Sequence, residues 1–122
     1  MLYLGPVSNE EAKGYFEKAD VKFNEDSGCV CCKDGNEILG FCLYDLDSTK
    51  MLVKYIEPTE DIALADGILR STLHVAAEHN ILDAFYADTM HYDFLKKIKF
   101  IKNEAEKRLD IDKLFKSCCD CG

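Results

Sequence analysis

No apolar run in the sequence approaches the roughly 20 residues that a helix needs to span a membrane. The N-terminal segment MLYLGPVSNEEAK lacks the basic flank and long apolar region of a secretory signal peptide. Basic residues are the scarcer charge, with 15 Lys and Arg against 23 Asp and Glu, and the net charge of −8 disfavours binding to nucleic acid or to an anionic membrane. We therefore expect a cytoplasmic protein with no nucleic-acid partner and no membrane partner.

The common catalytic signatures are also missing. The sequence has no Gly-x-Ser-x-Gly elbow, no Walker phosphate loop and no His-Glu-x-x-His zinc motif. His74 and His79 are five residues apart on a predicted helix, about 140° around its axis, so they cannot hold one metal ion together. We interpret them as surface or hydrogen-bonded helix residues.

Seven cysteines are present, a high and odd number, so they cannot all pair within the chain. In a reducing compartment free thiols or a metal site are the default. Cys29 and Cys31 share one face of a predicted strand and are interpreted as small buried residues. The tail at 117–122 holds Cys118 and Cys121 at Cys-x-x-Cys spacing, which the strand pair could complete to four zinc ligands. Since Cys-x-Cys is not the usual second pair, we assign no metal site, and zinc or a redox-active tail stays an alternative.

The length and composition predict one globular domain over residues 1–122, since 48% of the residues are apolar and 31% are charged. Local patterns predict that this domain is mixed α/β. Ser8 with Glu11 forms a capping box, Asp34-Gly35-Asn36 is a hairpin turn signal, and Asn80 is predicted as a left-handed residue that ends the central helix. Strands are expected at residues 2–4, 29–33, 37–44, 51–56, 83–87 and 100–103, and helices from Ser8 to about Lys18 and at 62–79, 91–97 and 110–116.

The strand at 51–56 leads through a short acidic turn with Pro58 into the helix at 62–79. A strand that feeds a helix N-terminus presents free backbone N–H groups, which bind anions such as a cofactor phosphate. Strict alternation along the strand would place Met51, Val53 and Tyr55 on one face and Leu52, Lys54 and Ile56 on the other.

Residues 37–101 resemble the GNAT fold of acetyl-CoA-dependent N-acetyltransferases. Ile56-Glu57-Pro58 matches the Val-x-Pro-like end of the family's fourth strand, and Gly67 matches the last glycine of its phosphate loop. Leu69 and Leu73 match the apolar face of the helix that follows. The segment at 94–100, FLKKIKF, is similar to the family's Leu-Tyr-x-Lys-x-Gly-Phe segment.

The resemblance implies a mixed, mostly antiparallel sheet flanked by helices. It further implies that strands 51–56 and 83–87 are parallel, are joined by a crossover helix and splay apart at their C-terminal ends. The implied function is transfer of an acetyl or other acyl group from CoA to an amine of unknown identity, with acetyl-CoA as cofactor. The implied site residues are the backbone of Ile56, the amides of Ile62, Ala63, Leu64, Ala65, Asp66 and Gly67, the side chain of Arg70, and Tyr92 as proton donor. Glu57, at the end of the strand, is a candidate general base, and the alternative is a plain solvated carboxylate.

Several positions depart from the family pattern. Ile62 stands where the loop has Arg or Gln, Ala65 stands for its first glycine, and Leu95 stands for its tyrosine, which is why Tyr92 is the substitute. Three carboxylates, those of Glu60, Asp61 and Asp66, surround the loop and would oppose a phosphate, although Arg70 could offset them. The alternative function is therefore a non-catalytic binding module with the same fold, and the cysteine-rich tail could serve it as a metal or redox element.

Overall fold

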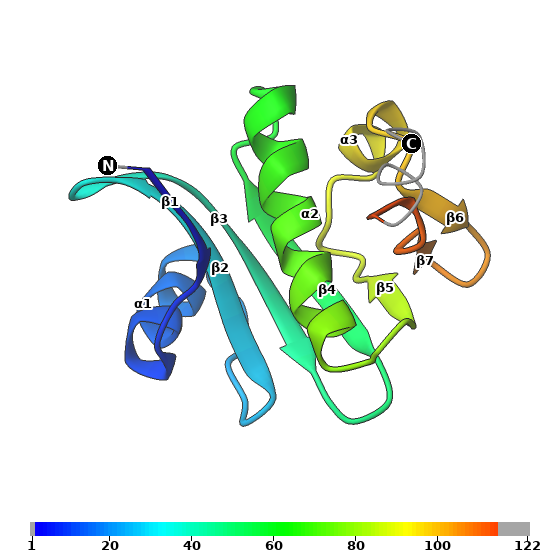
Figure 1. The fold of residues 1–122 in the computed structure, drawn as a ribbon, viewed down its shortest axis with the longest axis horizontal. Helices are drawn as coiled ribbons and strands as arrows, with labels where there is room; N and C mark the ends of the chain where they lie inside the picture. Colours follow the sequence, from blue (N-terminus) through cyan, green and yellow to red (C-terminus); the bar gives the residue numbers. More distant parts are fainter. Residues whose placement is uncertain (1, 115–122) are drawn as a thin grey trace.

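The computed structural model describes residues 2–114, which form one seven-stranded sheet in the order β1-β2-β3-β4-β5-β7-β6 (Figure 1). Neighbouring strands are antiparallel, apart from β4 and β5, which are parallel. The strands are β1 (Leu2–Pro6), β2 (Ser27–Asp34), β3 (Glu37–Leu46), β4 (Met51–Glu57), β5 (Ala84–Tyr86), β6 (Ile101–Asn103) and β7 (Arg108–Leu109), and the helices are α1 (Asn9–Ala19), α2 (Ile62–Glu78) and α3 (Tyr92–Lys97). The mixed class, the element order and the parallel pair are as expected, and β7 is an addition.

The C-terminal predictions are only partly within the described residues. The cysteine-rich tail at 117–122 lies outside them, and the zinc and redox alternatives lie outside with it. Of the helix predicted at 110–116, residues 113 and 114 are helical, 110–112 are not, and 115–116 are beyond the described range.

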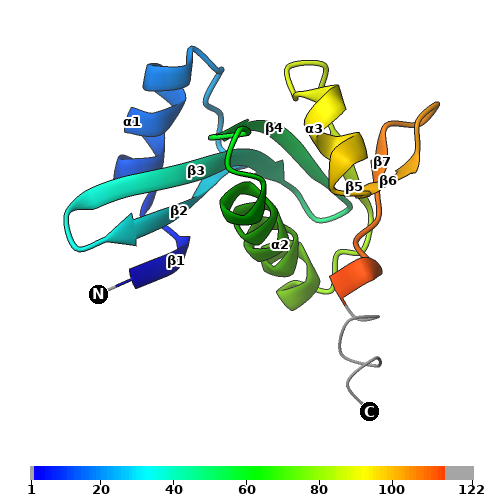
Figure 2. The same ribbon diagram turned by 90° about the horizontal axis from the view of Figure 1, so that it is seen from above.

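Helix α1 covers one face of the sheet, on the side opposite to α2 (Figure 2). Ser8 caps it as predicted, since its side chain accepts a hydrogen bond from the Glu11 amide at 3.3 Å. Ala12 and Phe16 are its buried residues, and they pack on the sheet against Cys29, Cys31, Phe41 and Leu43.

Helix α2 joins the parallel strands β4 and β5 and buries its apolar stripe on the other face. The stripe consists of Ala65, Ile68, Leu69, Leu73 and Ala76 with Thr72. Full burial of each large aliphatic side chain stabilises the fold by about 1.5–3 kcal/mol. Asp61 caps the helix through the Leu64 amide. The C-cap is His79, and Asn80, the next residue, has the predicted left-handed backbone, with φ 61°.

Strand β4 contains a bulge that the alternation did not predict. Leu43 pairs with Tyr55 and Tyr44 with Val53, so Lys54 is an extra residue in β4. Beyond the bulge the faces exchange: Ile56 joins the α2-side core, whereas Tyr55 lies on the α1 side, 5.9 Å from the Phe41 ring. The predicted faces of Tyr55 and Ile56 were therefore wrong.

Candidate functional site

The candidate site lies where β4 outruns its parallel neighbour. Pairing of β4 with β5 ends at Val53 and Tyr86, followed by one bond from the Ala87 amide to the Val53 carbonyl at 2.9 Å, while β4 continues to Glu57. The Thr89 hydroxyl then donates to the carbonyl of Lys54. From there the two chain segments no longer pair.

Two pockets adjoin this strand end. The first, which we name the Glu57 pocket, measures about 390 Å³ and is lined by Leu39, Tyr55, Ile56, Glu57, Pro58, Thr59, Glu60 and His91. The second, the Lys97 pocket, measures about 410 Å³ and is lined by Thr59, Ile62, His91, Tyr92, Asp93, Phe94 and Lys97. Because Thr59 and His91 line both, the pockets form a continuous surface from the end of β4 to α3.

Glu57 is held in place within its pocket. The Tyr55 hydroxyl donates to its Oε1 at 2.8 Å. Burial raises the pKa of Tyr55, and the hydrogen bond to Glu57 raises it further, so the phenol stays protonated and remains a donor. The Tyr55 ring lies 6.3 Å from the ring of His91, across the pocket. A fixed, half-buried carboxylate of this kind can accept a proton from a bound amine.

Tyr92, the expected proton donor, has another partner. It is the first residue of α3, and its hydroxyl donates to Glu104, which together with desolvation raises its pKa to about 12. An acid with so high a pKa gives up its proton to a thiolate less readily than an unperturbed phenol does. Tyr92 would therefore be a weak proton donor in that role.

The start of α2 offers fewer amides than the resemblance implies. The helix begins at Ile62, the Leu64 amide bonds to the Asp61 side chain, and the Ala65 amide bonds to the Asp61 carbonyl. The next two residues, Asp66 and Gly67, lie within the helix, where amides bond to carbonyls four residues earlier. Only the amides of Ile62 and Ala63 remain at the open end of the helix.

Gly67 has a different setting from that expected of a loop glycine. A Cβ added there would meet nothing within 4 Å, and the residue lies in the second turn of α2. No described neighbour therefore requires a glycine at this position.

Arg70 is engaged along the helix and not at its start. Its Nε lies 3.0 Å from Asp66 Oδ2, and its guanidinium lies 5.1 Å from the centroid of the Phe100 ring. The pair neutralises one of the three carboxylates, leaving those of Glu60 and Asp61.

The basic residue that does line a pocket with Ile62 is Lys97. Sequence reasoning missed it because a run of lysines does not show which one faces the start of α2.

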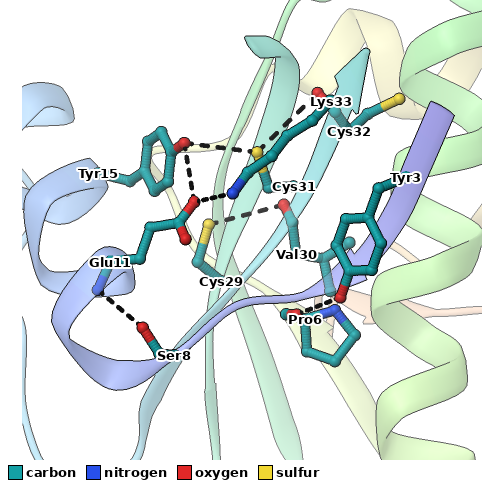
Figure 3. A network of polar contacts seen from close by, with 10 residues as sticks. All are labelled: Tyr3, Pro6, Ser8, Glu11, Tyr15, Cys29, Val30, Cys31, Cys32 and Lys33. Atoms are coloured by element: carbon teal, nitrogen blue, oxygen red, sulfur yellow. Dashed lines mark hydrogen bonds and ion pairs between the residues drawn. The ribbon is translucent and has the colours of Figure 1, made fainter. Parts of the chain in front are cut away.

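The described cysteines are buried in the cores. Cys29, Cys31, Cys32 and Cys42 are free thiols, and burial raises the pKa of Cys42 to about 12. In Figure 3 Cys31 lies beside the Tyr15 hydroxyl at 3.6 Å, and that hydroxyl donates to Glu11, which pairs with Lys33. These thiols are buried packing residues, as predicted for Cys29 and Cys31. Within residues 2–114 no three His, Cys, Asp or Glu side chains are grouped to hold a metal ion.

Comparison with known proteins found no matching family model and no matching curated protein. Among the described residues, no helix is both long and apolar enough to cross a membrane.

Proposed function

We propose that the chain is an N-acyltransferase that moves an acetyl or other acyl group from CoA to an amine. The observation that supports it best is the open end of β4, where two adjoining pockets follow a parallel strand pair joined by α2. A CoA thioester is long enough to occupy both pockets, with its phosphates in one and its acyl group in the other.

The Lys97 pocket would hold the phosphates. The amides of Ile62 and Ala63 and the positive end of the α2 dipole attract an anion, and the Lys97 ammonium adds a full charge. The Thr59 hydroxyl, which lines both pockets, would donate to the same ligand. When bound, acetyl-CoA would supply an activated thioester carbonyl.

The Glu57 pocket would receive the amine. Glu57 would take a proton from the ammonium form of the acceptor, while Tyr55 keeps the carboxylate oriented. The neutral amine would then attack the thioester carbonyl, and CoA would leave as a thiolate that takes up the second proton released by the nitrogen. The backbone of Ile56 at the open strand end would hydrogen-bond the acyl group. Tyr92 would line the phosphate pocket only, since its hydroxyl serves Glu104.

A titration with acetyl-CoA, followed by amide chemical shifts, tests this function. We expect shifts at Ile62, Ala63 and Lys97, and an affinity about fivefold lower in Lys97→Gln. Asp61→Asn keeps a good cap but removes a carboxylate, so it should tighten binding by a similar factor at low salt. Lys50→Gln, in the exposed β3–β4 turn, is the control. No binding at millimolar ligand by either the native chain or Asp61→Asn would end the proposal.

A second candidate, a non-catalytic binding module, is favoured by the carboxylates of Glu60 and Asp61 at the start of α2. Both oppose a phosphate, and Asp61 also occupies the Leu64 amide. The same titration separates the two functions, because a well-folded chain whose spectrum does not respond to acetyl-CoA has the fold without the donor site.

A further inference from the structure

A second group of positive charges lies on the other side of α3. The segment at 94–102 contains four lysines and no carboxylate, in a chain whose net charge is −8. Three of them, Lys96, Lys99 and Lys102, line a groove of about 380 Å³ with Ile101 and Glu104. We name it the lysine groove. It adjoins β6, which is the last strand of the sheet order and therefore an edge strand.

The lysine groove is distinct from the Lys97 pocket. Lys96 and Lys97 are neighbours on α3, about 100° apart around the helix axis, and each lines a different hollow. Tyr92 lines the Lys97 pocket, while its ring lies 5.4 Å from the Lys96 ammonium and its hydroxyl donates to Glu104. Tyr92 thus stands between the two hollows.

The nearby carboxylates neutralise the groove only in part. Glu104 itself lines the groove, and Asp112 pairs with Lys102 at 3.0 Å. Among the described residues, neither Lys96 nor Lys99 has a carboxylate within ion-pair distance. Lys99 follows α3 with φ 59°. Burial and the positive charges of Arg70 and Lys99 lower the pKa of the neighbouring Lys113.

We propose that the lysine groove binds a phosphate-bearing small molecule, with Lys96 and Lys99 as the principal charge contacts and Lys102 as a third. Lysine ammonium groups attract phosphate oxygens as point charges. Three of them around one groove suit a ligand whose several phosphate oxygens can each contact a different ammonium group. The groove has the size of a small-ligand site. The proposal does not depend on the function proposed above, because it uses none of the residues of that site except the dividing Tyr92.

The direct test is a titration with inorganic pyrophosphate at constant ionic strength, followed by amide chemical shifts. We expect saturable shifts concentrated at residues 96–104. Lys99→Gln should weaken binding about fivefold or more, Lys99→Arg should restore most of it, and Lys50→Gln should leave it unchanged. Lys102→Gln should weaken it less, because Asp112 already neutralises part of that charge.

Glu104 supplies a second test, because its carboxylate lines the groove and opposes an anionic ligand. Glu104→Gln removes that charge and should tighten pyrophosphate binding. Unchanged binding in Glu104→Gln would show that the ligand does not occupy the groove.

The proposal is overturned if the shifts do not saturate, if they are spread over the whole chain, or if Lys99→Gln and Lys50→Gln bind pyrophosphate equally.

Competition with CoA then identifies the source of the phosphate. If CoA displaces pyrophosphate from residues 96–104, the natural ligand is a phosphate of the acyl carrier. If it does not, the ligand is a different phosphorylated molecule, and the groove is a separate site. Shifts from acetyl-CoA confined to Ile62, Ala63 and Lys97 would support the acyltransferase function whatever the groove does.

Discussion

Two tyrosine hydroxyls near the end of β4 each donate to a glutamate. The position of that glutamate determines which pocket each tyrosine affects. Tyr55 holds Glu57 inside the pocket where an amine would be deprotonated. Tyr92 holds Glu104 beside the lysine groove instead. Spacing in the sequence pointed to Tyr92, because it lies one turn from the family position, but its pKa is set mainly by Glu104, which is twelve residues away in the sequence.

The Tyr92 hydrogen bond makes a prediction about pH. Its pKa is raised from 10.0 to about 12, mainly by donation to Glu104. The folded chain therefore binds the phenolic proton more tightly than the unfolded chain does. The stability that this contributes is fully present below pH 10 and is lost as the pH rises towards 12. We expect the difference in Tm between the native chain and Tyr92→Phe to be constant near neutral pH and to shrink above about pH 10.

Circular dichroism melts over this range measure the difference directly, and comparison with the variant cancels the titration of the other tyrosines, the lysines and the thiols. A Tm difference that stays constant through pH 12 would show that Tyr92 does not donate to Glu104.

Among the secondary-structure elements, local chemistry accounts for most of what could be predicted. The Ser8 cap, the turn at Gly35 with φ 64° and the left-handed Asn80 depend on residues close in sequence, and all three are confirmed. The bulge at Lys54 could not be predicted in this way, since its ammonium is held by Asp45 on the neighbouring strand at 2.7 Å. The two-residue strand β7 likewise exists through its partners in β5 and β6.

The residues of the candidate site differ in the same way: some are placed by local sequence and could be predicted, and others are placed by contacts distant in sequence and could not. Its place at the end of β4, with Ile56 and Glu57, follows from one continuous strand–turn–helix segment and was predicted. Tyr55 was missed because the bulge turns it towards His91, and Lys97 was missed because its place depends on how α3 packs. Arg70 was placed at the phosphate loop, but its partner Asp66 is one turn back along the same helix face.

Replacing one glycine in helix α2 and one in strand β3 by alanine should change the stability in opposite directions. Gly67→Ala should stabilise the fold by about 0.5–1 kcal/mol, because alanine is the better helix former and, apart from the adjoining helix backbone, no described atom lies within 4 Å of the new methyl group. Gly40→Ala should destabilise it by about 1–3 kcal/mol, because its Cβ would lie 2.6 Å from the Glu57 carbonyl oxygen and 2.7 Å from Ile68 Cδ1.

Urea unfolding of both variants measures these changes, and Gly14→Ala in α1, also with open space around it, is a second stabilising control. A destabilised Gly67→Ala would mean that the glycine has a neighbour or a role that the helix position does not show.

At the scale of the molecule, the sheet separates two cores. The α1-side core contains Cys29 and Cys31, and the α2-side core contains Cys32 and Cys42, so all four described thiols are shielded by packing. We expect a chain with Cys118→Ser, Cys119→Ser and Cys121→Ser to show no thiol that reacts quickly with an aromatic disulfide reagent in the native state, and four in denaturant.

The rate of slow native-state reaction then reports opening of the cores. Rapid modification of even one thiol without denaturant would contradict the packing of that face. Reduced and oxidised samples should melt alike, because burial keeps the four thiols apart from solvent oxidants.

The uneven lengths of strand pairing have a consequence for hydrogen exchange. Strands β2 and β3 share eight residue pairs, whereas β5 has three with β4 and one with β7. Amides in β5, α3 and β7 are therefore expected to exchange through a partial opening of lower free energy than global unfolding, while β2 and β3 stay protected. Since α3 carries Lys97 and Tyr92, this opening would remove one wall of the Lys97 pocket and of the lysine groove at once. A ligand in either hollow would then slow exchange throughout the C-terminal strands, well beyond the residues that it touches.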